Sequence, residues 1–186
     1  LPISNVTHVI AATDASGACS RTLKVLMAIL KGIWILKTEW IKACMQSKCP
    51  VDEEPYEISL DSCGCCDGPK TGRLRALNNA PQLFNGLRFF VSGNLVPLHK
   101  TYIQDLMIAG GGTIIASKDE LKQFSDGRSS PSVLVVYDND AMLGTQDTVL
   151  QCQAEAKKVA CRSQAITPSW VVDSIASGSL QPFARR

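Results

Sequence analysis

Two cations and a hydroxyl lie at the start of a predicted helix, where they could bind an anion. The stretch CSRTLKVLMAILK carries Arg21, Thr22 and Lys24. Ser20 precedes them and predicts the N-cap of a helix that runs to about Lys31. The first turn of a helix has unpaired N–H groups and a partial positive charge, so it normally favours acidic side chains. Cations become favourable there once a phosphate binds the free N–H groups, because Lys and Thr then add charge-assisted donors. The residues by themselves also fit a solvated helix face, which is the simpler interpretation.

The cysteines offer a second kind of chemistry. Three of the eight lie in CGCCDG, at Cys63, Cys65 and Cys66. A structural zinc site needs four ligands, and its cysteine pairs are usually separated by two residues. Cys63 and Cys66 have that spacing, but no second pair lies close, and the only histidines are His8 and His99. We therefore expect no metal here, but an exposed, oxidisable linker.

No catalytic set of residues stands out. With two histidines in the chain, acid–base catalysis has few candidates, and no Ser/His/Asp or Cys/His combination is evident. The GGG at 110–112 follows a predicted helix and does not precede one, which argues against a phosphate-cradling loop. We therefore expect neither an enzyme nor a cofactor.

Composition narrows the remaining classes of function. The chain has 186 residues, of which 45% are hydrophobic, enough for a real core. A net charge of +2 is too small for bulk attraction to nucleic acid. No run approaches 18 apolar residues, so we expect no transmembrane helix and no membrane partner. A chain of this size does not depend on disulfides, which indicates reduced thiols in the cytosol or nucleus.

Short apolar strands alternate with helices along most of the chain, which favours parallel sheets with helices on their faces. From 49 to 82, prolines, acidic residues and CGCC predict a linker with a short helix near 75–80. The predicted strands are 7–12, 33–36, 87–93, 113–116, 132–137 and 164–167, and the predicted helices are 20–31, 37–48, 97–109, 146–158 and 168–178.

An internal repeat organises these elements. LKTEWIKACMQSK and ITPSWVVDSIASG share a strand end, a Thr, a Trp and an apolar helix, and THVIAATDAS parallels PSVLVVYDND. Trp40 and Trp170 are the expected core anchors of two copies of one α/β module, and Thr38 is the expected N-cap of the first Trp helix. The first copy would span 1–48 without its opening strand–helix–strand, a linker 49–83, and the second copy 84–186.

The ordered set of motifs resembles the BRCT family. In the second copy, GLRFFVSG, AGGGTII, SVLVVY and AITPSWVVDSI match throughout, whereas the first copy matches from its third strand onward. Two copies with a linker resemble tandem BRCT domains. The resemblance implies two modules, each with a small parallel four-stranded sheet flanked by helices, the first lacking its opening elements.

The resemblance also implies a function and a site. Tandem BRCT domains of this type bind phosphoserine peptides in nuclear DNA-damage-response and DNA-repair scaffolds. It assigns Thr22 and Lys24 to the phosphate. A groove would receive the apolar side chain three residues after the phosphoserine. Its lining residues would be Arg21, Leu26, Leu98 and Val172, although ordinary packing remains an alternative for Leu26 and Leu98. Pro97 and Leu98 depart from the pattern of one family branch, which leaves the preferred apolar residue open.

The family resemblance also bears on the rest of the protein. It implies that the full-length protein forms a heterodimer through a domain outside this chain. Part of the phosphate pocket would come from the missing opening strand. We therefore expect weak phosphopeptide binding by this chain and stronger binding by a longer one.

Two other interpretations remain. A reader of modified nucleosomes or DNA would use a basic surface, and a purely structural arm of a heterodimer would bind neither ligand. Nucleosome or DNA binding would lose affinity steeply with salt, whereas a phosphopeptide would bind through one dominant charge site. The candidate basic residues are Lys31, Lys37, Lys42, Lys70, Arg73 and Arg75.

Overall fold

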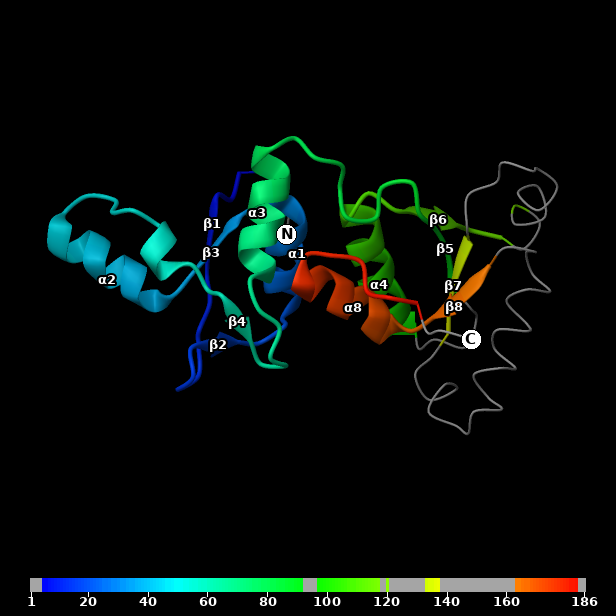
Figure 1. Ribbon diagram of the computed structural model, residues 1–186, viewed down its shortest axis with the longest axis horizontal. Helices are drawn as coiled ribbons and strands as arrows, with labels where there is room; N and C mark the ends of the chain where they lie inside the picture. Colours follow the sequence, from blue (N-terminus) through cyan, green and yellow to red (C-terminus); the bar gives the residue numbers. More distant parts are fainter. Residues whose placement is uncertain (1–4, 92–96, 118–119, 121–132, 138–162, 184–186) are drawn as a thin grey trace. The chain divides into compact units, whose positions relative to one another are not determined.

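The computed structural model describes residues 5–91, 97–117, 120, 133–137 and 163–183, and the chain divides into two compact units. The first unit comprises Leu1–Leu83 and Ser174–Leu180, and the second comprises Phe84–Asp173 and Gln181–Arg186. Figure 1 shows the elements of each unit along the chain. Within the described ranges, no helix is long and apolar enough to span a membrane.

Two short parallel strand pairs form the sheets of the first unit. β1 (His8–Ile10) pairs with β3 (Trp34–Leu36), with Val9 opposite Ile35. β2 (Ala18–Cys19) pairs with β4 (Leu60–Asp61). The predicted strands at 7–12 and 33–36 are confirmed as β1 and β3. β2 and β4 were not predicted, because two residues are too few to establish an alternating pattern.

Helix α1 (Leu23–Lys31) begins later than the sequence predicts. Its N-cap is Thr22 and not Ser20: the Thr22 Oγ1 accepts the Val25 N–H at 3.3 Å. The prediction of Ser20 was wrong because Ser and Thr are both good N-caps, and spacing alone could not choose between them. Gly32 closes the helix in the left-handed conformation, with φ of 66°, as expected of a glycine after the last turn.

Helix α2 (Thr38–Ser47) lies at the surface of the first unit. Its N-cap is Lys37, so the prediction of Thr38 was also wrong. None of its side chains is buried in this structure, and Met45 is 74% exposed. Trp40 is half-buried: its ring stacks on His8 with centroids 5.0 Å apart. The expected core anchor is therefore only partly enclosed in the first unit.

The stretch predicted as a linker contains regular structure. A short 3-10 helix, η1 (Glu54–Tyr56), precedes β4, and α3 (Gly68–Leu77) follows it. α3 starts earlier than the helix predicted near 75–80, and it packs against α1. A Cβ on Gly72 would collide with the Ile29 carbonyl oxygen, so the two helices approach through glycine.

The second unit contains a four-stranded, all-parallel sheet in the order β6-β5-β7-β8. Its strands are β5 (Arg88–Val91), β6 (Thr113–Ile115), β7 (Val133–Val136) and β8 (Gln164–Ile166). All four strands were predicted. Every residue of β7 is buried, as expected of a central parallel strand covered on both faces.

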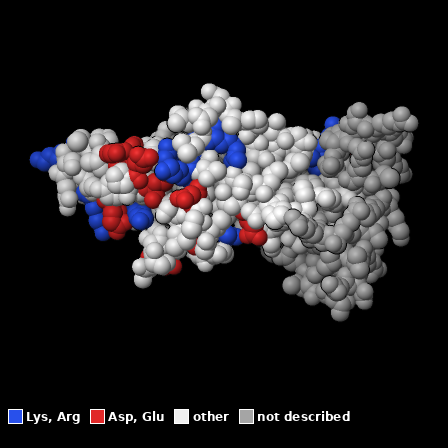
Figure 2. Space-filling view, viewed as in Figure 1, with Lys and Arg blue, Asp and Glu red and all other residues white. Residues whose placement is uncertain are grey.

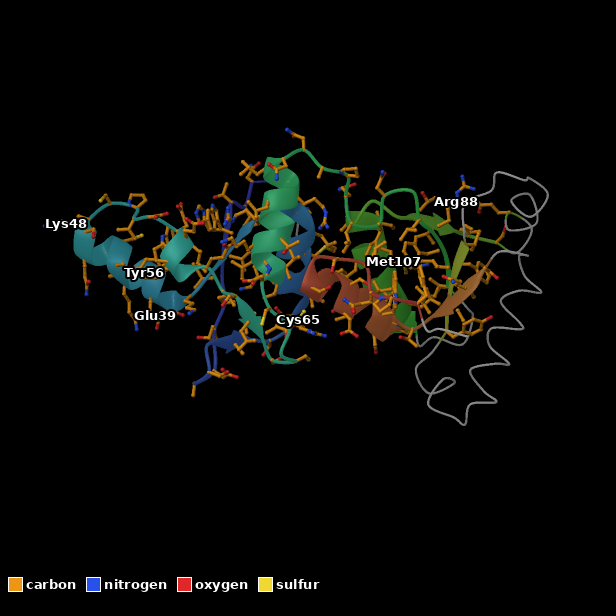
Figure 3. The ribbon with its side chains drawn as sticks, viewed as in Figure 1. Glu39, Lys48, Tyr56, Cys65, Arg88 and Met107 are labelled. Atoms are coloured by element: carbon orange, nitrogen blue, oxygen red, sulfur yellow. The ribbon has the colours of Figure 1, made fainter. Side chains whose placement is uncertain are left out.

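Two described helices accompany this sheet. α4 (Pro97–Ala109) contributes the fully buried Leu106 and Met107 to the core, and Figure 3 labels Met107. α8 (Pro168–Ser177) begins in the second unit, and its residues from Ser174 onward are part of the first. Both helices were predicted, whereas the helix predicted at 146–158 lies outside the described residues.

Candidate functional site

The start of α1 presents free donors to an anion. The Thr22 side chain already bonds to the Val25 N–H, and the Thr22 carbonyl accepts the Leu26 N–H at 3.0 Å. Among the described residues, nothing accepts the N–H groups of Leu23 and Lys24. No acidic side chain lies in the first turn. The positive end of α1 is therefore not neutralised by its own sequence.

Lys24 places a positive charge beside these donors. Its side chain is exposed, and its Nζ donates to the Ile10 carbonyl oxygen at 3.3 Å. Ile10 ends β1, so the contact ties Lys24 to the loop that leads from β1 towards α1. An ammonium group held by one long hydrogen bond can move to a phosphate at little cost.

Arg21 has a different environment from Lys24. Its Nε donates to the Asp61 Oδ2 at 2.6 Å, and the two side chains are only 17% and 11% exposed. This charge-assisted bond neutralises Arg21 close to the helix start. The structure thus separates the two predicted cations into an exposed Lys24 and a paired, largely buried Arg21.

Asp61 is a functional candidate that sequence reasoning missed. Its Oδ1 accepts the N–H groups of Cys63 and Cys65, both at 2.8 Å, and closes the loop after β4. The letters DSCG are a typical turn signature, so the loop could have been predicted. The pairing with Arg21 could not, because it joins residues 40 positions apart.

The Arg21–Asp61 pair lines a small, mainly apolar recess of the first unit. Cys65 and Leu26 are also among the residues of its wall. Figure 3 labels Cys65 in the loop that follows β4. Leu26 has no exposed surface, so it packs inside the first unit in this structure. Its assignment to a peptide groove stays a prediction.

The other two predicted groove residues belong to the second unit. Val172 is half-buried on α8. Leu98 lies in the first turn of α4, and its side chain is outside the part of the molecule that the structure describes. Their roles also remain predictions.

The cysteines differ in environment. Cys63 and Cys66 are exposed, whereas Cys19 is 2% exposed and lines the recess. Burial raises the pKa of the Cys19 thiol, and the nearby Asp61 charge raises it further. Across the described ranges, no group of three or more His, Cys, Asp or Glu side chains is arranged to hold a metal ion.

The proposed basic surface is interrupted by acidic partners. Arg73 forms two hydrogen bonds to Glu57, at 2.9 and 2.7 Å, and its Cζ lies 3.7 Å from the centre of the Trp34 ring. These bonds raise the pKa of Arg73 above its ordinary value. Lys70 lies 3.9 Å from Glu54. Figure 2 shows red and blue side chains next to one another on the visible face, and the glutamate partners of Lys70 and Arg73 interrupt the proposed basic surface at these two residues.

The internal repeat is visible in atomic detail. The Trp40 Nε1 donates to the Val51 carbonyl at 3.0 Å, and the Trp170 Nε1 donates to the Gln181 carbonyl at 3.1 Å. Each acceptor lies 11 residues after its tryptophan. Trp170 is 9% exposed and stacks on Phe84, which confirms its core role in the second unit.

Comparison with known proteins places this geometry in context. Residues 2–45 match the family model of the BRCA1 C Terminus (BRCT) domain. The chain is 45% identical over 190 residues to BRCA1-associated RING domain protein 1 of Arabidopsis thaliana, covering 96% of this chain and 26% of that protein. It is 34% identical to the human protein of the same name, covering 97% of this chain and 22% of the relative. The chain thus spans about a quarter of the length of these relatives.

Solved structures with the same fold include pairs of BRCT domains. The S. pombe Brc1 BRCT5-BRCT6 domains superpose with a TM-score of 0.62 and 18% identity, covering 94% of this chain and 79% of that one. Rtt107p in its complex with a phosphorylated histone gives a TM-score of 0.56 and 12% identity, covering 94% and 72%. At these identities the likeness concerns the fold.

Proposed function

Because the chain is a tandem BRCT protein by its fold and its relatives, we propose that it binds phosphoserine peptides at the start of α1. The observation that carries this proposal is the open first turn of that helix. Two backbone N–H groups without described acceptors, the Thr22 cap and the exposed Lys24 lie within one turn. A dianionic phosphate would satisfy these donors and the helix dipole together.

We propose that different side chains of the site contact the phosphate and the peptide chain. Lys24 and Thr22 would both bond to the phosphate, because the Thr22 Oγ1 accepts the Val25 N–H and its own O–H remains a possible donor. Arg21 would contact the peptide after the phosphoserine. The groove roles of Leu26, Leu98 and Val172 toward an apolar residue three positions later rest on the family resemblance, and Leu26, which has no exposed surface in this structure, would have to become accessible. No residue of this site is assigned a catalytic role, and we propose that the module is not an enzyme.

The wider context of the protein is part of the same proposal. Relatives named BRCA1-associated RING domain protein 1 and Protein BREAST CANCER SUSCEPTIBILITY 1 homolog support a nuclear role in DNA repair. A heterodimer formed by a domain outside this chain would be consistent with the first of these names. The phosphorylated histone in the Rtt107p complex supports a phosphorylated chromatin protein as one class of partner.

The decisive experiment compares matched peptides. A library of peptides with serine or phosphoserine at a fixed position, and varied residues after it, should give binding only when the serine is phosphorylated. Titration calorimetry on the selected peptide and its unphosphorylated twin then measures the difference. Equal affinity of the twins would refute the proposal.

Salt dependence separates phosphopeptide binding from the nucleosome or DNA interpretation. A DNA reader would lose affinity steeply between low and high salt, because each neutralised backbone phosphate releases counterions. The pairing of Arg73 with Glu57 argues against such a surface in this part of the molecule. Steep salt dependence with duplex DNA or nucleosomes, and no preference for phosphoserine, would favour that second function.

A further inference from the structure

The Arg21–Asp61 pair connects the helix start to the loop after β4. The Nε–Oδ2 distance of 2.6 Å is short for a bond between nitrogen and oxygen, as expected when both groups are charged. Arg21 directly precedes the N-cap Thr22. The side chain that Asp61 holds therefore belongs to the residue that leads into α1.

Asp61 is itself held in place by the loop. Its Oδ1 accepts the N–H groups of Cys63 and Cys65, and its own N–H donates to the Cys65 carbonyl at 3.0 Å. Together with the Arg21 Nε–H, the Cys63 and Cys65 N–H groups give the two carboxylate oxygens of Asp61 three donors, which fix the orientation of the carboxylate. With only 11% of its side chain exposed, Asp61 cannot easily exchange these partners for water.

We propose that Asp61 is a positioning residue for phosphopeptide binding, which acts by holding the Arg21 guanidinium in the wall of the recess beside the helix start. This inference rests on the proposed function of α1. Arg21 then contacts the peptide chain as a neutralised group of fixed orientation, and Lys24 alone supplies the cationic side chain to the phosphate. The loop after β4 becomes part of the peptide site although it does not touch the phosphate.

A direct contact between Arg21 and the phosphate predicts the opposite change in peptide affinity when Asp61 is substituted. If Arg21 were a direct phosphate ligand, Asp61 would compete with the phosphate for the guanidinium. Removing the negative charge of Asp61 would then strengthen binding. If Asp61 positions Arg21, removing that charge breaks the short bond that orients the guanidinium, and the side chain shifts from its place in the wall of the recess.

Asp61→Asn is the informative substitution because it separates the two sets of bonds. The amide oxygen of Asn can still accept the Cys63 and Cys65 N–H groups and keep the loop closed. The amide nitrogen would face the Arg21 Nε, where two donors cannot bond. Asp14→Asn is the matched control: Asp14 also closes a loop of the first unit, through Ser16 and Ala18.

Titration with the phosphoserine peptide selected above tests the proposal. Asp61→Asn and Arg21→Gln should each weaken binding about tenfold, as for one charge-assisted hydrogen bond, and Asp14→Asn should leave binding unchanged. The double variant should bind no more weakly than either single variant, because both changes break one pair. Tighter binding by Asp61→Asn, or losses that add in the double variant, would overturn the proposal.

An NMR measurement of hydrogen exchange tests the hydrogen bond between Arg21 and Asp61 in the absence of peptide. The Arg21 Nε–H should exchange slowly with water in the parent and in Asp14→Asn, and quickly in Asp61→Asn. Rapid exchange in the parent would also overturn the proposal. If the parent binds phosphorylated and unphosphorylated peptides equally, the function of α1 fails. If the parent discriminates but Asp61→Asn binds normally, only the role of Asp61 fails.

Discussion

At the scale of single residues, Lys24 is the side chain on which the proposed function depends most directly. Lys24→Met should weaken phosphopeptide binding by about 1.5–3 kcal/mol, the contribution of a hydrogen bond to a charged group. Folding stability should change little, because the side chain is exposed and its Nζ makes one long bond to Ile10. Calorimetry and urea denaturation of the same sample measure both quantities.

Lys31 provides the control for this substitution. It is exposed in the last turn of the same helix, away from the open N–H groups. Lys31→Met removes the same charge from the protein and should leave peptide affinity unchanged. An equal loss of affinity in both variants would mean that net charge, and not a site, attracts the peptide.

Lys48 marks a position where the backbone favours another residue. It ends α2 with φ of 56°, in the left-handed region, and Figure 3 labels it at that end of the helix. Gly178 takes the equivalent place after α8, with φ of 65°. Lys48→Gly should therefore stabilise the protein, by about 1 kcal/mol, because glycine adopts this conformation without steric cost.

Urea denaturation of Lys48→Gly tests this expectation. Lys42→Gly, in the interior of the same helix, should do the opposite and destabilise by about 1 kcal/mol. Should both glycines lower the midpoint, the left-handed cap would not be a source of strain.

At the scale of elements, the two tryptophan helices should differ in their contribution to stability. Trp170→Ala should cost roughly 3–5 kcal/mol, the range for a buried aromatic side chain. Trp40→Ala should cost less, because Trp40 is half-buried and α2 buries no side chain in this structure. Chemical denaturation with matched Trp→Phe variants, which keep an aromatic ring but lose the indole hydrogen bond, separates packing from hydrogen bonding. Equal costs for the two alanine variants would contradict the difference in burial.

The contact between α1 and α3 depends on a glycine. Ala has a higher helix propensity than Gly by about 1 kcal/mol, so Gly72→Ala would stabilise an isolated helix. Here the added Cβ meets the Ile29 carbonyl oxygen, and the helices must separate. We expect a net destabilisation of about 1–3 kcal/mol, typical of overpacking. Lys70→Ala, on the exposed side of α3, is the control and should be nearly neutral; a stabilised Gly72→Ala would show that the helices can part freely.

Helices and strands that carry several large apolar residues could be predicted from the sequence. Helix α3 shows why an element without such residues could not. α1 carries such residues at helical spacing, and β5 and β7 stand out as short apolar runs bounded by polar or turn residues. The buried residues of α3 are Gly68, Pro69 and Gly72, which resemble those of a loop. Their role is to let another backbone approach, and that requires knowledge of the partner. The Arg21–Asp61 pair escaped prediction for the same reason, since only the fold joins two such distant positions.

At the scale of the whole molecule, the cysteines yield a prediction about composition. We expect protein purified without chelators to contain no stoichiometric zinc, because a zinc site needs four ligands and the described residues include no group of even three His, Cys, Asp or Glu side chains arranged to hold a metal. Metal analysis by mass spectrometry measures this directly. One zinc per chain that disappears when Cys63 and Cys66 are replaced by Ser would show that a ligand has been overlooked.

The assignment of Ser174–Leu180 to the first unit has a consequence for how the protein is made. The Arg75 Nη2 donates to the Gly178 carbonyl at 2.6 Å, so α3 needs a partner that is translated after the second unit's Phe84–Asp173. Domains usually fold in the order in which they leave the ribosome. Here the Arg75 side chain cannot make its bond to Gly178 until the ribosome has translated nearly the whole chain, so the first unit gains its last segment only after the second unit's residues have emerged.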